Sequence, residues 1–240
     1  MTHNIKIFEV GGSIRDEMLG IDNPPDRDFC AEAPSWEVLL AWCKTNMDKV
    51  FLVTPEFFTV RGIIGKDAID IVMCRIDGTS SDGRHPDLVK AGTLMDDLAR
   101  RDFTVNAMAR EVDPKTLRPI GEIIDPHSGQ EDLKNNTLRC VGITQQRLQE
   151  DGLRLLRAAR FIVTKGFLPD EDLKHVLETS TWWSWLEETV STERIREELH
   201  KMFVHDTAAA MKFLVWNCSV NAIRKLFNDD IWLKPTMEKK

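Results

Sequence analysis

The sequence predicts an α/β fold, a small mixed sheet with helices over residues 1–140, followed by an all-α part over residues 141–240. Two observations predict this division. Short apolar runs, several rich in β-branched residues, dominate the first half of the chain. From residue 144 onward, apolar residues recur instead at helical spacing. A chain of 240 residues can form one large or two modest domains, and we expect two.

The first part is expected to contain five strands and two helices. The strands are predicted from apolar runs at residues 5–10, 27–31, 50–53, 57–64 and 68–74. Residues 35–47 predict a helix, because Trp36 and Leu39 share its apolar side. The polar, glycine-rich stretch 77–92 predicts a long loop, and residues 94–110 predict a return to helix.

The second part is expected to be helical. Residues 144–165 place Leu148, Leu155 and Ala159 on one side, and Gly166 follows as a helix stop. Three further helices are predicted, over residues 191–203, 208–216 and 220–227.

The composition excludes several classes of protein. A hydrophobic fraction of 42% and a charged fraction of 30% are typical of soluble globular proteins. No apolar run approaches the roughly 18 residues of a membrane span, and the N-terminus shows no apolar signal core. The five scattered cysteines lack a CxxC pair, which favours free thiols in the cytoplasm over a cysteine zinc site. A net charge of -7 argues against general coating of nucleic acid but permits a local basic groove.

The most informative stretch is VGGSIRDEMLGIDNPPDRDF, residues 10–29. Asp26 and Asp28 lie two residues apart in a strand-like run, so their side chains point to the same face. Two adjacent carboxylates remain ionised together when a cation lies between them, and Mg²⁺ prefers such oxygen ligands. Asp70, flanked by isoleucines in a later strand, is the candidate third carboxylate. Three carboxylates around two metal ions are the arrangement for in-line phosphoryl or nucleotidyl transfer.

The glycines of the same stretch predict a phosphate site. Gly11 and Gly12 follow a strand and precede a helix-like run, so their backbone amides can bind an anionic phosphate. The Ser13 hydroxyl can add a hydrogen bond, and Arg15 can add positive charge. The alternative is a turn followed by a solvated acidic loop, because a GG pair and a DxD pair are each common alone. Their combination with Asp70 favours the nucleotide site.

This stretch resembles the signature of the bacterial-type, class II tRNA nucleotidyltransferase and poly(A) polymerase family. Four later blocks resemble the same family, in its order: DLARRDFTVNAMA at 97–109, IIDPHSGQEDLKNNTLR at 123–139, EDGLRLLRAARF at 150–161 and TERIREEL at 192–199. The resemblance implies the nucleotidyltransferase fold, with a catalytic head over residues 1–140. It also implies a helical neck and shortened body over residues 141–240, for nucleotide selection and RNA binding.

The resemblance implies roles for individual residues of the head. Asp26 and Asp28 would be ligands of Mg²⁺, with Asp70 as the third catalytic carboxylate. The residues that would bind the nucleotide in the family's pattern are Gly12, Arg15 and Arg101. The segment DGRHPDLV, which includes Asp82 and Arg84, resembles the family's flexible loop near the active site.

Four residues three apart predict a stripe along one helix of the second part: Asp151, Arg154, Arg157 and Arg160. A salt-bridged amphipathic helix would show the same pattern. In the family this helix selects the nucleotide. A carboxylate accepts a hydrogen bond from an exocyclic amine, and an arginine donates one to an unprotonated ring nitrogen. Cytosine and adenine both present this amine and ring nitrogen on one edge of the base, whereas uracil and guanine do not. Asp151 with Arg154 is therefore expected to select C and A, and the later arginines to contact base or phosphate. Gly152 is expected to loosen the first turn of this helix.

The resemblance implies an enzyme that adds C, C and A to tRNA 3′ ends from CTP and ATP by two-metal nucleotidyl transfer. Alternatives within the family are a poly(A) polymerase, which the segment RGIIGKDAIDI disfavours, and an enzyme that adds only C or only A. An alternative from another class is an RNA-binding module on an inactive scaffold. The expected partners are a tRNA or another RNA 3′ end, ATP and CTP, without a membrane, and the oligomeric state is left open.

Overall fold

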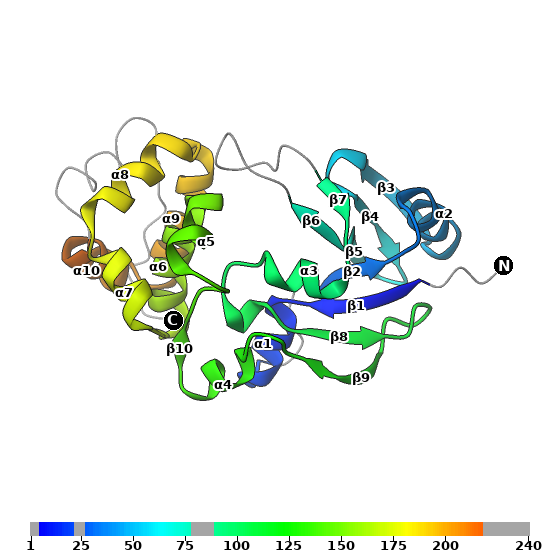
Figure 1. Cartoon of the computed structure of the whole chain (residues 1–240), viewed down its shortest axis with the longest axis horizontal. Helices are drawn as coiled ribbons and strands as arrows, with labels where there is room; N and C mark the ends of the chain where they lie inside the picture. The colour runs from blue at the N-terminus through cyan, green and yellow to red at the C-terminus, as the bar shows by residue number, and fades with distance from the viewer. Residues whose placement is uncertain (1–4, 22–26, 78–88, 218–240) are drawn as a thin grey trace. The chain divides into compact units, whose positions relative to one another are not determined.

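The structure, a computed structural model, describes residues 5–21, 27–77 and 89–217 of the 240 (Figure 1). The chain divides into two compact units, and the change from the first to the second falls between Leu133 and Lys134. The first unit is built on a sheet, and the second consists mainly of helices.

The first unit contains a seven-stranded sheet in the order β3-β4-β5-β2-β1-β8-β9. Its strands are β1 (Lys6–Val10), β2 (Asp28–Glu32), β3 (Lys49–Thr54), β4 (Thr59–Ile64), β5 (Asp67–Met73), β8 (Ala109–Val112) and β9 (Pro119–Ile124). The pair β2–β5 is parallel, and the neighbouring pairs on both sides are antiparallel. The predicted small mixed sheet is therefore confirmed.

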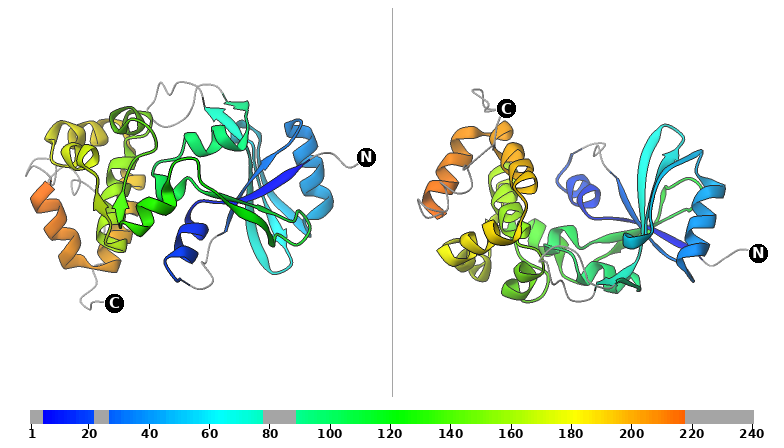
Figure 2. Two further views of the ribbon diagram at one scale, coloured as in Figure 1. Left: turned by 60° about the horizontal axis from the view of Figure 1, so that its bottom comes forward. Right: turned by 90° about the horizontal axis from the view of Figure 1, so that it is seen from above.

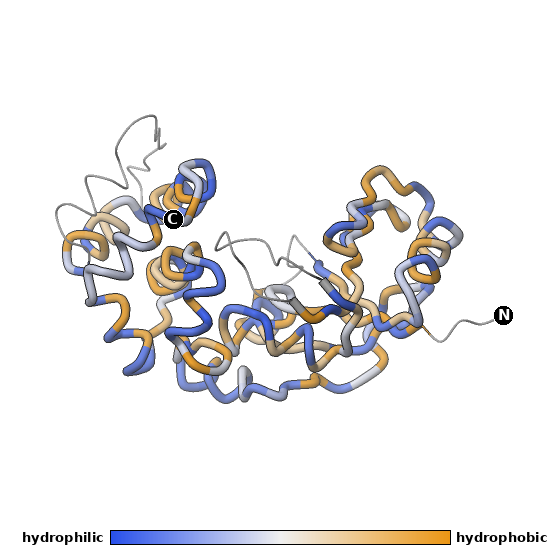
Figure 3. The backbone as a smooth tube through the Cα atoms, turned by 45° about the horizontal axis from the view of Figure 1, so that its top comes forward, coloured by the Kyte–Doolittle hydropathy of each residue, from blue (hydrophilic) through white to orange (hydrophobic). Residues whose placement is uncertain are grey.

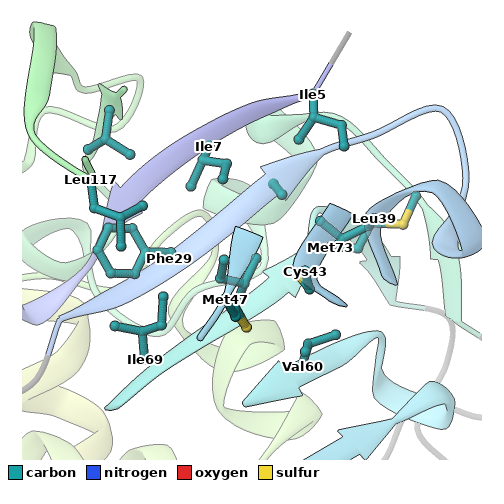
Figure 4. Packing of buried hydrophobic residues seen from close by; sticks show 13 residues of the cluster. Ile5, Ile7, Phe29, Leu39, Cys43, Met47, Val60, Ile69, Met73 and Leu117 are labelled. Carbon is teal, nitrogen blue, oxygen red and sulfur yellow. The ribbon is translucent and has the colours of Figure 1, made fainter. Parts of the chain in front are cut away.

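One face of this sheet packs against α2 (Trp36–Asn46). Figure 4 shows Phe29 and Ile69 from the strands pointing into the same cluster as Leu39 and Cys43 of the helix. Two further views in Figure 2 show α2 lying beside the sheet. The helix begins where predicted, because the Ser35 hydroxyl accepts the Val38 N–H at 3.4 Å.

The opposite face of the sheet packs against α3 (Leu94–Ala99), through Leu94 and Leu98. Side chains alternate along a strand. Because Phe29 and Ile71 are buried on the α2 face, Asp28 and Asp70 fall on the other face. The fold of the head thus places both candidate carboxylates on one side of the sheet.

Two predicted elements of the head are shorter than expected. The strand predicted over residues 57–64 begins only at Thr59, because residues Pro55–Phe57 form a 3₁₀ turn, η1, that ends in a left-handed Phe58. The loop predicted over residues 77–92 pairs at its two ends, as β6 (Arg75–Asp77) and β7 (Val89–Ala91). The part of this loop that contains Asp82 and Arg84 lies outside the described residues.

The helix predicted over residues 94–110 is wrong beyond Ala99. The chain turns at Arg100, continues through the 3₁₀ turn η2 (Thr104–Asn106) and then enters β8. The reason is tertiary, because Ala109 and Val112 are completely buried in a strand that pairs with β1. The elements α1 (Gly12–Met18) and α4 (Gly129–Lys134) complete the first unit.

The second unit has six described helices and one short parallel strand pair. They are β10 (Thr137–Leu138), α5 (Thr144–Glu150), α6 (Leu153–Lys165), β11 (Leu168–Pro169), α7 (Glu171–Leu177), α8 (Ser180–Thr189), α9 (Thr192–His205) and α10 (Thr207–Asn217). The residues predicted to form apolar faces are buried, including Leu155 and Ala159 of α6 and Leu199 of α9. Gly166 ends α6 with a φ of 74°, as predicted. The helix predicted over residues 220–227 lies outside the described residues.

The single helix predicted over residues 144–165 is broken at Asp151 and Gly152. Asp151 is extended, and its side chain accepts the Leu153 N–H at 3.0 Å, which starts α6 afresh. Gly152 stands just before α6 rather than inside it, which corrects the expectation that it loosens a helical turn. A Cβ on Gly152 would lie 2.8 Å from Thr189 Oγ1 and 3.0 Å from Trp185 Cζ3, so close packing against α8 requires glycine there.

The described cysteines are buried free thiols, at Cys30, Cys43, Cys74 and Cys140. None of the helices in the described part of the chain combines the length and apolar character needed to cross a membrane. Figure 3 shows hydrophilic residues distributed along both units.

Candidate active site

Two candidate carboxylates stand side by side on the sheet. Asp28, the first residue of β2, and Asp70 of β5 are Cα partners across the parallel pair. Directly paired residues of neighbouring strands point to the same face, about 5 Å apart. Asp28 is exposed and Asp70 half-buried, so both are open to a ligand. Asp26, two residues before Asp28, lies outside the described residues.

The glycine turn lies beside these carboxylates. Val10, the last residue of β1, is the Cα partner of Asp28 on its other side. The chain then turns at Gly11, whose φ is 80° and whose N–H donates to the Met108 carbonyl at 3.1 Å. Gly12 begins α1, and Ser13 is buried in its first turn. The predicted phosphate turn and Asp28 are therefore neighbours in the structure.

Arg101 lies against the glycine turn. A Cβ on Gly11 would stand 2.8 Å from Arg101 Nη1, so the guanidinium occupies the space that a side chain would need. The Asp97 carboxylate accepts from Arg101 Nη2 at 3.1 Å and also binds Arg100. Burial of Asp97 favours a raised pKa, but the two arginines outweigh it and hold the pKa of this carboxyl below its ordinary value.

Arg15 and Arg101 meet at Asn106. Arg15 Nη1 donates to Asn106 Oδ1 at 2.5 Å, and Arg101 Nη1 donates to the Asn106 backbone carbonyl at 3.4 Å. Asn106 is fixed in turn by a hydrogen bond from its Nδ2 to Asp102 Oδ1 at 3.0 Å. The structure therefore brings together the two head arginines predicted to bind the nucleotide, beside the glycines predicted to bind it.

Sequence reasoning missed the residues that hold these arginines. Asp97 precedes Arg100 and Arg101 by three and four residues, a helical ion-pair spacing that could have indicated it. Asn106 gave no local signal, because its partner Arg15 is 91 residues away in the chain. A third missed residue, Arg61, binds both oxygens of Asp70.

Arg27 anchors the strand that begins with Asp28. Its guanidinium donates to the buried Glu9 at 2.9 and 3.1 Å and to the Leu117 carbonyl at 2.8 Å. Glu9 also binds Arg110 at 3.1 Å. Burial tends to raise the pKa of Glu9, but Arg27 and then Arg110 hold it below its ordinary value. This network fixes the backbone on which Asp28 stands.

The donor set fits a hard divalent cation such as Mg²⁺. Asp28 and Asp70 offer carboxylate oxygens from one face, which is what such an ion prefers. The ion pair from Arg61 to Asp70 opposes this use of Asp70. Within the described residues, which do not include Asp26, no cluster of three or more His, Cys, Asp or Glu side chains forms a metal site.

Of the four residues predicted to form a stripe on one helix, the three arginines lie on α6 and Asp151 does not. Asp151 precedes α6, and its carboxylate pairs with Arg194 of α9 at 2.8 and 3.2 Å. Arg154, in the first turn of α6, donates to Glu150 at 2.6 Å and to the Arg147 carbonyl at 2.7 Å. Asp151 and Arg154 are thus joined through the backbone, where the Arg154 N–H donates to the Asp151 carbonyl at 3.0 Å.

Further along α6, Arg160 pairs with the buried Glu198 of α9 at 2.5 Å. Its guanidinium lies 4.3 Å from the centre of the Phe161 ring, and that of Arg157 lies 5.8 Å from it. Burial tends to raise the pKa of Glu198, but Arg160 outweighs it and lowers this pKa. Arg160 is therefore part of the contact between α6 and α9.

The sequence pattern of one protein family, the poly A polymerase head domain, matches residues 7–139. The chain belongs to this family. The match covers β1 to β10, which includes the carboxylates, the glycine turn and the arginines of the head. The family resemblance expected from the sequence is confirmed.

Two curated relatives that the chain resembles are both named CCA-adding enzyme. A CCA-adding enzyme of Lactobacillus helveticus (strain DPC 4571) is 34% identical over 210 residues, which are 86% of this chain and 49% of that enzyme. A CCA-adding enzyme of Enterococcus faecalis (strain ATCC 700802 / V583) is 36% identical over 200 residues, 82% of this chain and 45% of that enzyme. The chain thus spans about half the length of the curated relatives it matches.

Solved structures agree with this family. The CCA-adding enzyme of Bacillus stearothermophilus in complex with CTP has a TM-score of 0.71 at 29% identity, covering 88% of this chain and 48% of that one. The Thermotoga maritima CCA-adding enzyme complexed with tRNA_CCA has a TM-score of 0.71 at 28% identity, covering 94% and 49%. The expected nucleotidyltransferase-type α/β head with a helical C-terminal part is confirmed.

Proposed function

We propose that this chain adds C, C and A to the 3′ ends of tRNA, using CTP and ATP, by nucleotidyl transfer. The observation that carries the proposal is the pairing of Asp28 with Asp70 beside the Gly11 turn. The names of the relatives, and the CTP and tRNA in two of the similar structures, support the same activity. The chain matches about half of the length of each of these relatives.

In this proposal the head binds the triphosphate and positions the reacting groups. The Gly11 N–H is already bonded to the Met108 carbonyl, so the backbone amide at Gly12 and the Ser13 hydroxyl bind phosphate oxygens. Arg15 and Arg101 neutralise the phosphate charge. Asp28 and Asp70, together with Asp26 from outside the described residues, would hold Mg²⁺. When bound, such ions lower the pKa of the attacking RNA 3′ hydroxyl and stabilise the leaving pyrophosphate.

The second unit would select the nucleotide. Asp151 would accept a hydrogen bond from the exocyclic amine, and Arg154 would donate to the ring nitrogen of cytosine or adenine. A carboxylate has about four lone-pair positions, and Asp151 uses three of them for Leu153 and Arg194. One position is left for a base without breaking the pair with Arg194. Arg157 and Arg160 would contact base or phosphate.

The test is incubation of the chain with tRNAs that end before CCA, after C and after CC, with Mg²⁺ and each nucleotide separately. We expect C on the first two substrates from CTP alone, and A on the third from ATP alone. Long A tails would indicate a poly(A) polymerase instead, and a single active step would indicate a partial enzyme. RNA binding without incorporation would indicate an inactive scaffold. The proposed location is the cytoplasm, where tRNA and nucleotides are available.

A further inference from the structure

Arg61 binds the candidate third carboxylate through both of its oxygens. Arg61 of β4 and Asp70 of β5 are Cα partners across antiparallel strands. The Arg61 Nε donates to one oxygen of Asp70 and Nη2 donates to the other, the two-point geometry that a guanidinium and a carboxylate share. The Arg61 side chain is 48% exposed and that of Asp70 is 28% exposed, so a ligand can approach the pair.

Asp28 is the Cα partner of Asp70 on the side opposite Arg61. Arg61, Asp70 and Asp28 therefore follow one another across three neighbouring strands and share one face. One cationic side chain thus contacts Asp70 directly and lies on the same face as Asp28, two strands away.

We propose that Arg61 is a positioning residue that competes with the divalent cation for Asp70, and so lowers the affinity of the carboxylate pair for metal. This inference rests on the proposed function, in which Asp28 and Asp70 hold Mg²⁺. Arg61 supplies to Asp70 the positive charge that the ion would supply. A guanidinium and a divalent ion repel each other at neighbouring positions, so a closer cation requires Arg61 to loosen its hold on Asp70.

A purely structural role for Arg61 would change the stability of the fold rather than cation binding. Exposed ion pairs contribute little to the free energy of folding, because water screens them and the long side chain loses freedom. Arg61 also lies outside the buried cluster under α2. Its effect is therefore expected on cation binding rather than on stability, and thermal unfolding of each variant checks this point.

The experiment measures Mn²⁺ binding to the full 240-residue chain by electron paramagnetic resonance, without nucleotide or RNA. We expect Arg61→Gln to lower the Mn²⁺ dissociation constant by about tenfold, the size of the repulsion that it removes. Arg61→Lys keeps the positive charge but loses the two-point hydrogen bonding to Asp70, and should raise the affinity for Mn²⁺ by about threefold. In an Asp70→Asn background, the gain from Arg61→Gln should fall to about threefold or less.

Arg139→Gln is the matched control. Arg139 is 50% exposed and pairs with Asp170 at 3.2 Å in the second unit, so its loss changes the net charge equally. It should leave Mn²⁺ binding unchanged. An equal gain in Arg139→Gln would show a general charge effect and would overturn the proposal.

Two other outcomes separate this inference from the function on which it rests. If Arg61→Gln leaves Mn²⁺ binding unchanged or weaker while Asp28→Asn abolishes it, Arg61 does not compete and the proposed metal site stands. If Mn²⁺ binding survives both Asp28→Asn and Asp70→Asn, the ion binds elsewhere, and both the metal assignment and the role of Arg61 are overturned.

Discussion

Asp97 and Arg101 form a buried ion pair under the glycine turn, with Asp97 Oδ2 accepting from Arg101 Nη2 at 3.1 Å. Asp97 is completely buried and Arg101 about one-fifth exposed. The Asp97 carboxylate is bound within the protein, whereas the Arg101 guanidinium lies beside Gly11, where an added Cβ would be 2.8 Å from Nη1. This pair places a positive charge at the predicted phosphate site.

Asp97→Ala should destabilise the head strongly. It leaves Arg100 and Arg101 without their buried partner, and breaking a buried pair in this way costs roughly 3 kcal/mol or more. Urea unfolding measures the change in the free energy of unfolding. Asp96→Ala in the same helix removes a partly exposed capping-box carboxylate and should cost only about 1 kcal/mol. Equal losses in the two variants would show that burial of Asp97 does not matter.

Asp97 should also contribute to the acid sensitivity of the chain. Its pKa is below the ordinary value in the folded state, so its contribution to stability is fully present above the unfolded pKa of about 3.9. That contribution is lost as the pH falls from there through the folded pKa. The unfolding free energy of Asp97→Asn, measured between pH 7 and 2, should therefore fall less steeply below about pH 4 than that of the wild type. If the unfolding free energies of the two proteins fall in parallel with pH, other carboxylates cause the loss of stability in acid.

Gly11→Ala should weaken nucleotide binding by displacing Arg101. The new Cβ would lie 2.8 Å from Arg101 Nη1. Loss of one charged hydrogen bond to phosphate corresponds to roughly tenfold in affinity for CTP. Gly20→Ala is the control, because Gly20 has a φ of 77° but nothing within 4 Å of the new Cβ. Both variants carry the same backbone strain, of roughly 1 to 2 kcal/mol, and only Gly11→Ala should lose affinity.

Asp28→Asn should abolish incorporation while leaving the fold intact. Asp28 is exposed, so its change to an amide should alter the free energy of unfolding little, but it removes a proposed metal ligand. We expect a loss of roughly a thousandfold or more in kcat/KM. Asp67→Asn, at the exposed start of β5, is the control and should retain full activity. If Asp28→Asn reacts at a nearly normal rate and still requires Mg²⁺, the metal ion does not bind at β2.

Asp151→Ala should relax nucleotide choice more than it slows the reaction. It removes the proposed acceptor for the exocyclic amine and leaves the carboxylates of the head unchanged. The ratio of CTP to UTP incorporation on one primer should fall by roughly tenfold. Glu193→Gln, an exposed change in the first turn of α9, should leave the ratio unchanged. If Asp151→Ala also leaves it unchanged, Asp151 serves only its pair with Arg194.

Local patterns in the sequence were sufficient to predict much of this protein. The alternation around Asp28 and Asp70 defines which face each side chain takes, because strand geometry is set by adjacent residues. The helical spacing of Leu155 and Ala159 likewise predicts their burial, and Gly166 predicts the end of α6. The blocks at 10–29, 97–109 and 123–139 indicate the family from the sequence alone, and the family match over residues 7–139 confirms it.

The tertiary structure alone decided which distant residues meet. Arg15 contacts Asn106 across 91 residues, and Arg61 meets Asp70 because β4 and β5 pair in one particular register. The helix predicted beyond Ala99 becomes β8, since an open edge of β1 offers backbone partners and burial. The break at Gly152 depends on Thr189 and Trp185 standing too close for any side chain. Register, burial and close approach depend on residues far apart in the chain, and the spacing of neighbouring residues carries no information about them.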